Sequence, residues 1–270
     1  MADATNNPLS ATLSDYHARF SGIGRLYGVA GWERLRAAHV CVIGLGGVGS
    51  WVVEALARSG IGAMTLVDMD DICVTNVNRQ LPALDGQIGR TKVASLAERV
   101  RAISPQCKVT ARMDFFTPKT SDYILSDNFS LMVDAIDSSE NKCLLLAECR
   151  RRGLPIITCG GAGGRKDPTQ VRIADVAMTT HDPLMFKVRR VLRAEYGFPR
   201  DVKEPFGIPC VYSPEEPVYP QSDGSVCDKP EAGSELRLNC DSGFGTASFV
   251  TGTFGFVMAA EAVRMITTPQ

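Results

Sequence analysis

The 270-residue sequence lacks an excess of charge of either sign. It contains 29 lysines and arginines against 30 aspartates and glutamates, a net charge of −1. No global positive field therefore attracts nucleic acid, and any RNA contact must come from a local patch. Hydrophobic residues make up 44% and charged residues 22%, which excludes a wholly disordered, collagenous or coiled-coil chain. The length fits one large domain, or one domain with a subdomain.

The sequence also lacks paired cysteine motifs. Its cysteines include no C-x-x-C pair, and their number is odd: Cys41, Cys73, Cys107, Cys143, Cys149, Cys159, Cys210, Cys227 and Cys240. This pattern argues against a disulfide framework and against a four-cysteine zinc site. We therefore expect mostly buried free thiols, a reducing cytoplasmic location and no structural zinc.

Neither end of the sequence carries a clear targeting segment. Residues 1–13 lack the basic start and apolar core of a signal peptide, and we expect a mobile tail over 1–18 before a single domain over 19–270. Residues 242–260 carry no charge and approach the ~20 residues of a membrane span. Because this stretch is rich in Gly, Ser and Thr and charges flank it, we expect a buried helix or a subunit interface, with membrane association as the alternative.

Short apolar runs alternate with helical patterns over the first 160 residues. We expect strands at 39–43, 64–68, 107–112, 131–136 and 155–159, and helices at 46–60, 91–103 and 140–152. This alternation predicts an α/β fold with a doubly wound, mostly parallel, Rossmann-like sheet that binds ligands at the carboxyl ends of its strands. We expect a nucleotide-binding half over 19–165 and a substrate and dimerisation half over 166–270. Residues 199–235, rich in Pro, Gly and acidic residues, are expected to form a lid or crossover loop.

A glycine-rich loop connects the first expected strand and helix. Its glycines are Gly44, Gly46, Gly47 and Gly49. Glycines let backbone N–H groups approach phosphates, and the following helix N-terminus supplies partial positive charge. Asp68 ends the second expected strand, where a carboxylate bonds ribose hydroxyls. These features alone fit NAD, FAD or ATP.

Cationic residues after the second strand favour ATP over NAD. Adenylation displaces pyrophosphate and needs cations on the developing charge, and Arg79 and Lys92 can supply them. Lys92 at a helix start opposes the helix dipole unless an anion lies there, and its alternative is a solvated surface lysine. Asp137 follows the strand at 131–136, where it would hold Mg²⁺ on the phosphates or cap the next helix.

Together these residues resemble the adenylating core of the ubiquitin-activating and molybdopterin-synthase-activating superfamily. The matching positions are the four loop glycines, Asp68, Asp70, Asn76, Asn78, Arg79, Gln80, Lys92 and Asp137. The similarity covers about residues 19–265. The strings DPTQ at 167–170, VYPQSDG at 218–224 and CDSGFG at 240–245 resemble the tRNA threonylcarbamoyladenosine dehydratase branch in particular.

The resemblance implies a homodimer that uses ATP to activate the threonine carboxylate of threonylcarbamoyladenosine, beside the tRNA anticodon, as an acyl adenylate. Ring closure by the carbamoyl group then releases AMP and gives cyclic threonylcarbamoyladenosine. The implied roles are ribose binding by Asp68, nucleotide and phosphate binding by Asp70, Asn76, Arg79, Gln80 and Lys92, Mg²⁺ binding by Asp137, and a contact of Arg25 with the partner subunit's phosphates. A monovalent cation, Na⁺ or K⁺, near the interface is a further expectation.

Two further groups are candidates with open alternatives. Cys240 could trap an acyl adenylate as a thiolate, but intramolecular ring closure needs no covalent catalyst, so a packing role or sulfur transfer with a cysteine-desulfurase sulfur-acceptor partner stays open. Lys187, Arg189, Arg190 and Arg193 gather on one expected helix, as an RNA contact or as a solvated face. Arg150, Arg151 and Arg152 lie at another helix end, where they could contact RNA phosphates, but their charges suit the helix dipole, and we favour that interpretation.

Three other functions fit parts of this pattern. The first is an adenylyltransferase that activates the C-terminus of a ubiquitin-like sulfur-carrier protein, which shares every adenylation residue. The second is an NAD-dependent oxidoreductase, which has no need of Arg79 or Lys92. The third is a nucleotide-sensing scaffold without turnover.

Overall fold

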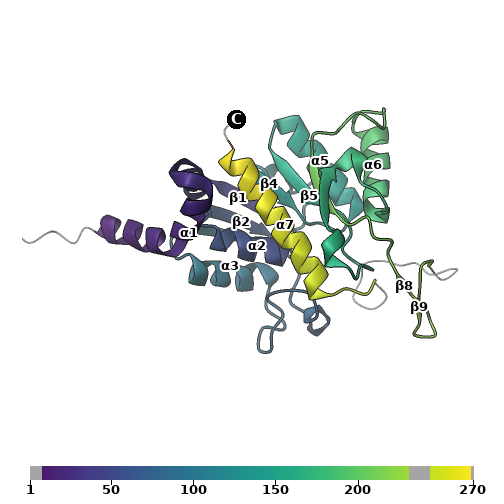
Figure 1. Cartoon of the computed structure of the whole chain (residues 1–270), viewed down its shortest axis with the longest axis horizontal. Helices are drawn as coiled ribbons and strands as arrows, with labels where there is room; N and C mark the ends of the chain where they lie inside the picture. The colour runs from purple at the N-terminus through teal and green to yellow at the C-terminus, as the bar shows by residue number, and fades with distance from the viewer. Residues whose placement is uncertain (1–7, 231–243, 269–270) are drawn as a thin grey trace, which may run out of the picture.

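A seven-stranded sheet forms the centre of the protein (Figure 1). The computed structural model describes residues 8–230 and 244–268. The sheet order is β3–β2–β1–β4–β5–β7–β6. The strands are β1 (His39–Ile43), β2 (Ala63–Val67), β3 (Lys108–Arg112), β4 (Leu131–Asp134), β5 (Ile156–Cys159), β6 (Arg172–Asp175) and β7 (Pro209–Tyr212). All neighbours pair in parallel except β6 and β7, so the expected doubly wound, mostly parallel sheet is confirmed.

Helices cover both faces of this sheet. They are α1 (Pro8–Ala37), α2 (Gly49–Arg58), α3 (Lys92–Ile103), α4 (Ser121–Ile124), α5 (Ser139–Arg152), α6 (Pro183–Glu195) and α7 (Ser248–Thr267), with short 3₁₀ turns η1 (Val74–Asn76), η2 (Pro168–Gln170) and η3 (Val176–Met178). Val40 and Val42 point into a core shared with α2, α3 and α7, whereas Cys41 and Ile43 point into a core shared with α5 and α6. This alternation is the period-two pattern of a strand buried on both faces.

Helix α7 is the long apolar segment that the sequence left between a core helix and a membrane span. It is long and apolar enough to cross a membrane, but 56% of its apolar 18-residue stretch is buried inside the protein. Val250, Phe254 and Met258 are fully buried against the sheet and its neighbouring helices, and α7 lies across the sheet in Figure 1. The expectation of a buried helix is therefore confirmed.

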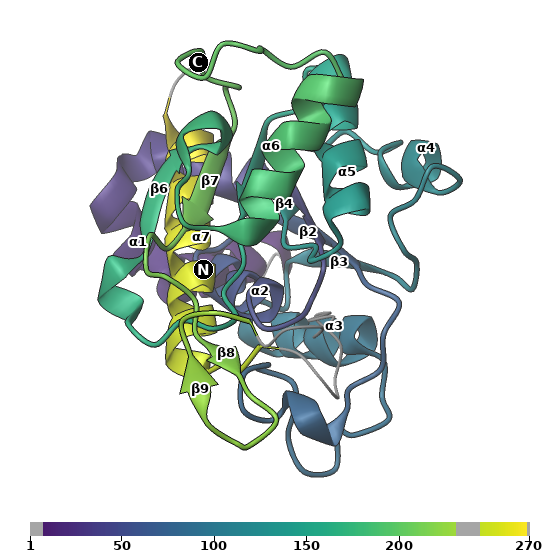
Figure 2. The same ribbon diagram turned by 90° about the vertical axis from the view of Figure 1, so that its right-hand side faces the viewer.

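The segment 199–235, expected as a lid or crossover loop, is not one irregular loop over its described part, 199–230, and residues 231–235 lie outside the described residues. Strand β7 lies within it, and its Cys210 and Val211 are fully buried between β5 and β6. The strand is only four residues long, so its apolar residues show no readable period, and its pairing is set by partners distant in sequence. Farther along, β8 (Tyr219–Pro220) and β9 (Val226–Cys227) form a small hairpin that projects from the body in Figure 1 and faces the viewer in Figure 2.

Residues 8–18, expected to be part of a mobile tail, are helical, because α1 begins at Pro8. Tyr16 is 2% exposed, its ring stacks on Trp32 with centroids 5.7 Å apart, and it packs against Phe20. Its hydroxyl donates a hydrogen bond of 2.6 Å to the carbonyl of Gly60. An aromatic cluster thus attaches the start of α1 to the turn after α2.

This attachment should make stability fall in strong alkali. Burial raises the pKa of Tyr16 to about 12 from an ordinary 10. Between these values the unfolded chain loses the phenolic proton and the folded chain keeps it, so the free energy of unfolding falls with rising pH, by about 2–3 kcal/mol. Urea unfolding of Tyr16→Phe should show about 1 kcal/mol lower stability at pH 7 and a shallower loss above pH 10.

The exposed Tyr123→Phe provides the matched control, with its side chain 57% exposed. It should leave both the stability at pH 7 and the alkaline slope unchanged. An unaltered alkaline slope in Tyr16→Phe would contradict this assignment.

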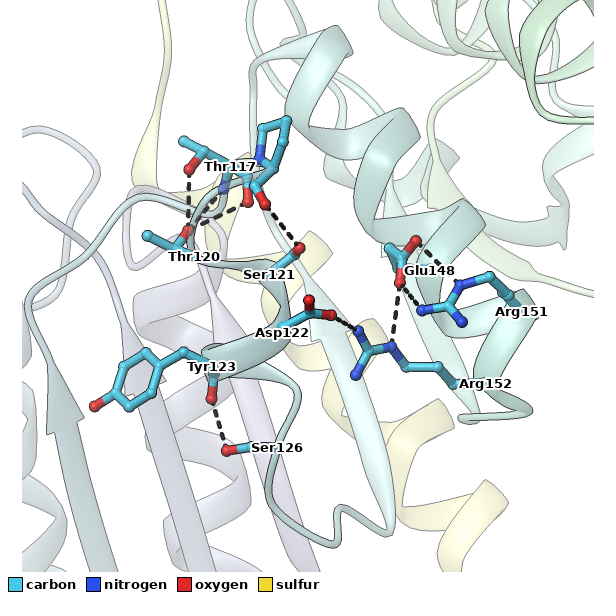
Figure 3. Close-up of polar contacts among 10 residues, drawn as sticks. Thr117, Thr120, Ser121, Asp122, Tyr123, Ser126, Glu148, Arg151 and Arg152 are labelled. Atoms are coloured by element: carbon cyan, nitrogen blue, oxygen red, sulfur yellow. Dashed lines mark hydrogen bonds and ion pairs between the residues drawn. The ribbon is translucent and has the colours of Figure 1, made fainter.

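The arginines at the end of α5 have partners inside the protein (Figure 3). Glu148 accepts hydrogen bonds from Arg151 and Arg152, and Arg152 also pairs with Asp122 of α4. The Arg150 guanidinium lies 4.4 Å from the ring centroid of Phe198. These contacts hold α4 and the chain after α6 against α5, which favours the structural interpretation of these three arginines over an RNA contact.

Candidate nucleotide-binding site

The glycine loop lies where β1 ends and α2 begins. Gly44 has a φ of +86°, and a Cβ there would lie 2.6 Å from the carbonyl oxygen of Ala135. A Cβ on Gly49 would lie 1.8 Å from the carbonyl oxygen of Gly44. Only glycine fits either position, and the result is a tight turn that exposes backbone at the N-terminus of α2.

A cavity of about 830 Å³ opens beside this loop at the carboxyl ends of the parallel strands. It brings together most of the residues singled out from the sequence: Gly44, Gly46, Gly47, Asp68, Asp70, Asn76, Asn78, Arg79, Gln80, Lys92 and Asp137. Gly49 supports the loop from behind and is not part of the lining. The edge of the sheet and the cavity coincide, as the α/β pattern predicts.

Asp68 holds the glycine loop from the end of β2. Its carboxylate accepts hydrogen bonds from the backbone N–H of Leu45 at 2.6 Å and of Asp70 at 2.8 Å. Burial raises the pKa of Asp68, against the opposing attraction of Lys92 and these two N–H groups. The carboxylate therefore lies directly beside the turn in which a nucleotide's sugar and phosphates would bind.

Lys92 is not a solvated surface lysine. It is 5% exposed at the first position of α3, with Nζ 2.7 Å from Asp70 Oδ2 and 3.8 Å from Asp68 Oδ1. Thr91 caps this helix by accepting a hydrogen bond from the N–H of Ala94. The ammonium group at this helix N-terminus is thus paired with two carboxylates of the chain itself, on the wall of the cavity.

Arg79 and Gln80 offer further polar groups. The Arg79 guanidinium donates a hydrogen bond to the carbonyl of Thr75 at 2.6 Å. The backbone carbonyl of Arg79 accepts hydrogen bonds from Trp51 Nε1 and Thr251 Oγ1. The Oε1 atom of Gln80 is buried without a hydrogen-bond partner within the described residues. An unsatisfied buried oxygen on the wall of a cavity is expected where a ligand completes the bonding.

Asn76 has a structural role as well. It is 3% exposed, and its side-chain oxygen accepts the N–H of Cys73 to close the turn η1. This turn holds the chain that carries Arg79 next to the glycine loop.

Asp137 is exposed and lines the cavity. Ser138 is the N-cap of α5, since its Oγ accepts the N–H of Asn141, so the alternative in which Asp137 caps this helix is wrong. Over residues 8–230 and 244–268, no group of three or more His, Cys, Asp or Glu side chains could hold a metal ion. A single carboxylate still suits Mg²⁺, which commonly binds through one or two carboxylates and the phosphates of its substrate.

The cavity also has apolar walls that the sequence did not indicate. Met69, Phe115, Phe116, Leu184 and Phe244 line it from four separate parts of the chain. Phe115 is 55% exposed and Met69 is 40% exposed. Their exposed surfaces offer a face on which a flat heterocycle can pack.

Other predicted residues lie away from this cavity. Arg25 is exposed on α1 and does not line it, and neither do the four basic residues of α6. Cys240 lies outside the described residues. Cys159 does line the cavity, but burial raises the pKa of its thiol to about 12, so it is protonated and unreactive at neutral pH.

The fold and the cavity define the class as Rossmann-like α/β proteins that bind a nucleotide at the end of the first strand. Within this class, the ThiF family matches residues 22–270, and the chain belongs to that family.

The chain is similar to several characterised relatives. It is 49% identical to tRNA threonylcarbamoyladenosine dehydratase of Escherichia coli K12, over 95% of this chain and 96% of the relative. It is 48% identical to the protein of the same name from Haemophilus influenzae, over 94% and 95%. The crystal structure of the E. coli enzyme in complex with ATP superimposes with a TM-score of 0.82 at 45% identity, over 93% of this chain and 94% of that one.

Proposed function

We propose that this protein is an ATP-dependent tRNA threonylcarbamoyladenosine dehydratase. The observation that carries the proposal is the near full-length similarity to the E. coli enzyme, combined with a cavity that gathers the glycine loop, Arg79, Lys92 and Asp137. The substrate is tRNA carrying threonylcarbamoyladenosine, and the products are the cyclic nucleoside, AMP and pyrophosphate.

The first step joins the threonine carboxylate to the α-phosphorus of ATP. A carboxylate oxygen forms the new O–P bond while the bond to pyrophosphate breaks, which places negative charge on the leaving group. Lys92 and Arg79 lie on the cavity wall where they can neutralise this charge. Asp137 would hold Mg²⁺, which neutralises phosphate charge when bound.

Ring closure is the second step. The carbamoyl group attacks the activated carbonyl carbon, and the C–O bond to AMP breaks. The carboxylate oxygen leaves with AMP and the threonylcarbamoyl group releases one N–H proton to solvent, so the nucleoside loses the elements of one water molecule. Attacking and attacked groups belong to one side chain, so proximity supplies much of the acceleration.

The alternative, activation of a ubiquitin-like sulfur-carrier protein, is not favoured. Relatives of nearly equal length with 48–49% identity are dehydratases, and the sequence contains none of the C-x-x-C pairs that a tetracysteine zinc site needs.

A product assay tests the function directly. Purified protein, Mg·ATP and tRNA bearing threonylcarbamoyladenosine are incubated, and the nucleosides are analysed by mass spectrometry under mild conditions. We expect an ATP-dependent loss of one water from the modified nucleoside. No mass change, together with pyrophosphate exchange that depends on a carrier protein, would support the alternative instead.

For the tRNA we propose a contact along α6. A groove of about 720 Å³ there is lined by Phe186, Arg189, Arg190, Arg193, Ala194 and Arg200, with Ala177 and Val202, and no carboxylate is among these residues. Two arginines of this groove have partners within the protein. Arg189 donates to Thr179, and Arg193 donates to the carbonyl of Pro199 and lies over Phe206.

Arg190 and Arg200 are exposed and are the better candidates for phosphate contacts. Leu184 of α6 lines the nucleotide cavity, although the residues that line the groove and those that line the cavity have no member in common.

The double variant Arg190→Gln/Arg200→Gln should bind modified tRNA more weakly. We expect the slope of log K against log salt to become shallower by about 1–2, because two phosphate contacts are lost. The control is Lys108→Gln/Lys119→Gln, since Lys108 lies at the amino end of β3, opposite the site, and Lys119 lies beside α4. Equal affinity and slope in the α6 variant and in the wild type would reject this surface.

We further propose that the protein is a cytoplasmic homodimer in which Arg25 reaches the partner subunit's phosphates. Leu26 and Val29, next to Arg25, are 76% and 73% exposed on α1, which suits a surface covered by a second copy. Sedimentation of the purified protein tests the dimer. A monovalent cation at the interface and a sulfur-acceptor partner acting on Cys240 stay proposals from the family resemblance.

A further inference from the structure

Three buried polar side chains form a closed arrangement beneath the floor of the nucleotide cavity. Asp134 ends β4, Lys142 lies on α5 and Thr158 lies on β5, and all three are fully buried. Lys142 Nζ donates to Asp134 Oδ2 at 2.7 Å and to Thr158 Oγ1 at 3.1 Å, and the Thr158 hydroxyl donates to the same Asp134 oxygen at 2.6 Å. We call these residues the buried triad.

The other oxygen of Asp134 holds the turn that leads to Asp137. Asp134 Oδ1 accepts the backbone N–H of Ile136 at 3.0 Å. The peptide of Ala135 and Ile136 is also the one against which Gly44 packs. One carboxylate therefore connects the buried triad to both the glycine loop and the turn that carries Asp137.

The segments that leave the buried triad line the cavity. Residues 135–137 follow Asp134, residues 159–162 follow Thr158, and Asn141 precedes Lys142, and all of them belong to the lining. The buried triad thus fixes the spacing between the ends of β4 and β5 at the point where a ligand would bind.

A fully buried ion pair is a poor way to stabilise a fold. Burial lowers the pKa of Lys142, but the charge and hydrogen bond of Asp134, together with the nearby Cys159 and Cys210, raise it, and the net shift is upward, so the ammonium group stays charged. Removing both charges from the interior often leaves stability unchanged or raises it, because two ions no longer need to be desolvated. We therefore explain this ion pair by the geometry that it imposes on the ends of β4 and β5 rather than by stabilisation of the fold.

We propose that Asp134, Lys142 and Thr158 are positioning residues that fix the 135–137 turn so that the Asp137 carboxylate is held toward the phosphates of Mg·ATP. This inference rests on the proposed ATP-dependent function, and it assigns no direct contact between the buried triad and the substrate.

The first test compares Thr158→Val with Thr158→Ser. Valine is close to threonine in shape but lacks the hydroxyl that bonds Asp134, whereas serine keeps it. We expect Thr158→Val to raise the half-saturating Mg²⁺ concentration and the KM for ATP about 5–10-fold, and Thr158→Ser to restore both to within about 2-fold. Calorimetric binding of AMP, which lacks the β- and γ-phosphates, should change by less than about 2-fold in either variant, because Asp137 acts on the phosphates.

The second test is the neutral double variant Asp134→Leu/Lys142→Met. It should stay folded, with a Tm close to that of the wild type, but bind Mg·ATP at least about 10-fold more weakly. The matched control is Glu54→Leu/Arg99→Met, since this pair joins α2 to α3 through bonds of 2.6 and 2.9 Å and lies outside the cavity lining. The control should change Tm without changing the Mg²⁺ dependence.

Each outcome decides the inference. Unchanged Mg²⁺ and ATP saturation in a folded Thr158→Val, or an equal change in Thr158→Ser, would overturn it and leave a purely structural pair. If the double variant does not fold, the two Thr158 variants still decide. If Thr158→Val binds Mg·ATP more weakly and the wild-type protein forms no cyclic nucleoside, the positioning role is supported while the proposed dehydratase function is rejected.

Discussion

Replacing Asp137 by asparagine should reduce turnover about 1,000-fold or more, equivalent to about 4 kcal/mol of lost transition-state stabilisation. The carboxylate lies on the cavity wall, directly after the turn held by Asp134. It does not cap α5, because Ser138 does. Its removal should therefore act on Mg²⁺ and the phosphates while the fold stays intact, so we expect kcat to fall far more than Tm.

Single-turnover formation of the cyclic nucleoside, followed by mass spectrometry, measures this effect. Glu140→Gln is the matched control, since Glu140 is an exposed carboxylate in the first turn of the same helix and does not line the cavity. It should keep wild-type turnover. Full Mg²⁺-dependent activity in Asp137→Asn would remove Asp137 from the machinery and favour a scaffold that binds nucleotide without turnover.

Replacing Lys92 by methionine should lower kcat/KM for ATP about 100–1,000-fold, which is about 3–4 kcal/mol. The variant removes a buried positive charge and leaves Asp68 and Asp70 without their shared cation. Since the attraction of Lys92 opposes the rise in the pKa of Asp68, that pKa should rise further in the variant. We therefore expect Lys92→Met to lose more affinity for ATP than for adenosine, relative to the wild type, and to release pyrophosphate more slowly.

Two comparisons separate the charge of Lys92 from its ion pairs. Asp70→Asn breaks the 2.7 Å pair but keeps the ammonium group, so its effect should be smaller than that of Lys92→Met. Lys108→Met removes an exposed lysine at the start of β3 and should have no effect. Equal losses in Asp70→Asn and Lys92→Met would contradict a direct role of Lys92 in charge neutralisation.

Local patterns in the sequence predicted the first five strands and the helices α2, α3 and α5, and four of these strands, β1, β2, β4 and β5, are short apolar runs buried on both faces. Strand β3 is largely exposed, and the short helix α4 was not predicted. The same patterns located the glycine loop and the positions of Asp68, Lys92 and Asp137 at the sheet edge. Strand β7 could not be found in this way, since its four residues lie between Pro- and Gly-rich stretches and are defined by pairing with β5 and β6.

The apolar walls of the site were missed for a related reason. Phe115 follows β3, Leu184 lies on α6 and Phe244 precedes α7, and only the folded chain brings them together. Tyr16 was missed because its packing partners Trp32 and Gly60 are 16 and 44 residues away. Sequence periodicity reports burial of a face, but it does not report which distant segment covers that face.

Helix α7 also has a consequence for biosynthesis. Phe244, Thr246 and Thr251 line the cavity, and Thr251 donates to the carbonyl of Arg79, 172 positions earlier. A nascent chain that has emerged only to residue 240 therefore has the glycine loop but not a complete binding site. Because such long-range contacts form late, the emerging chain depends on the start of α7 for a competent site, and ligand binding becomes a marker that residues 244–251 have joined the fold.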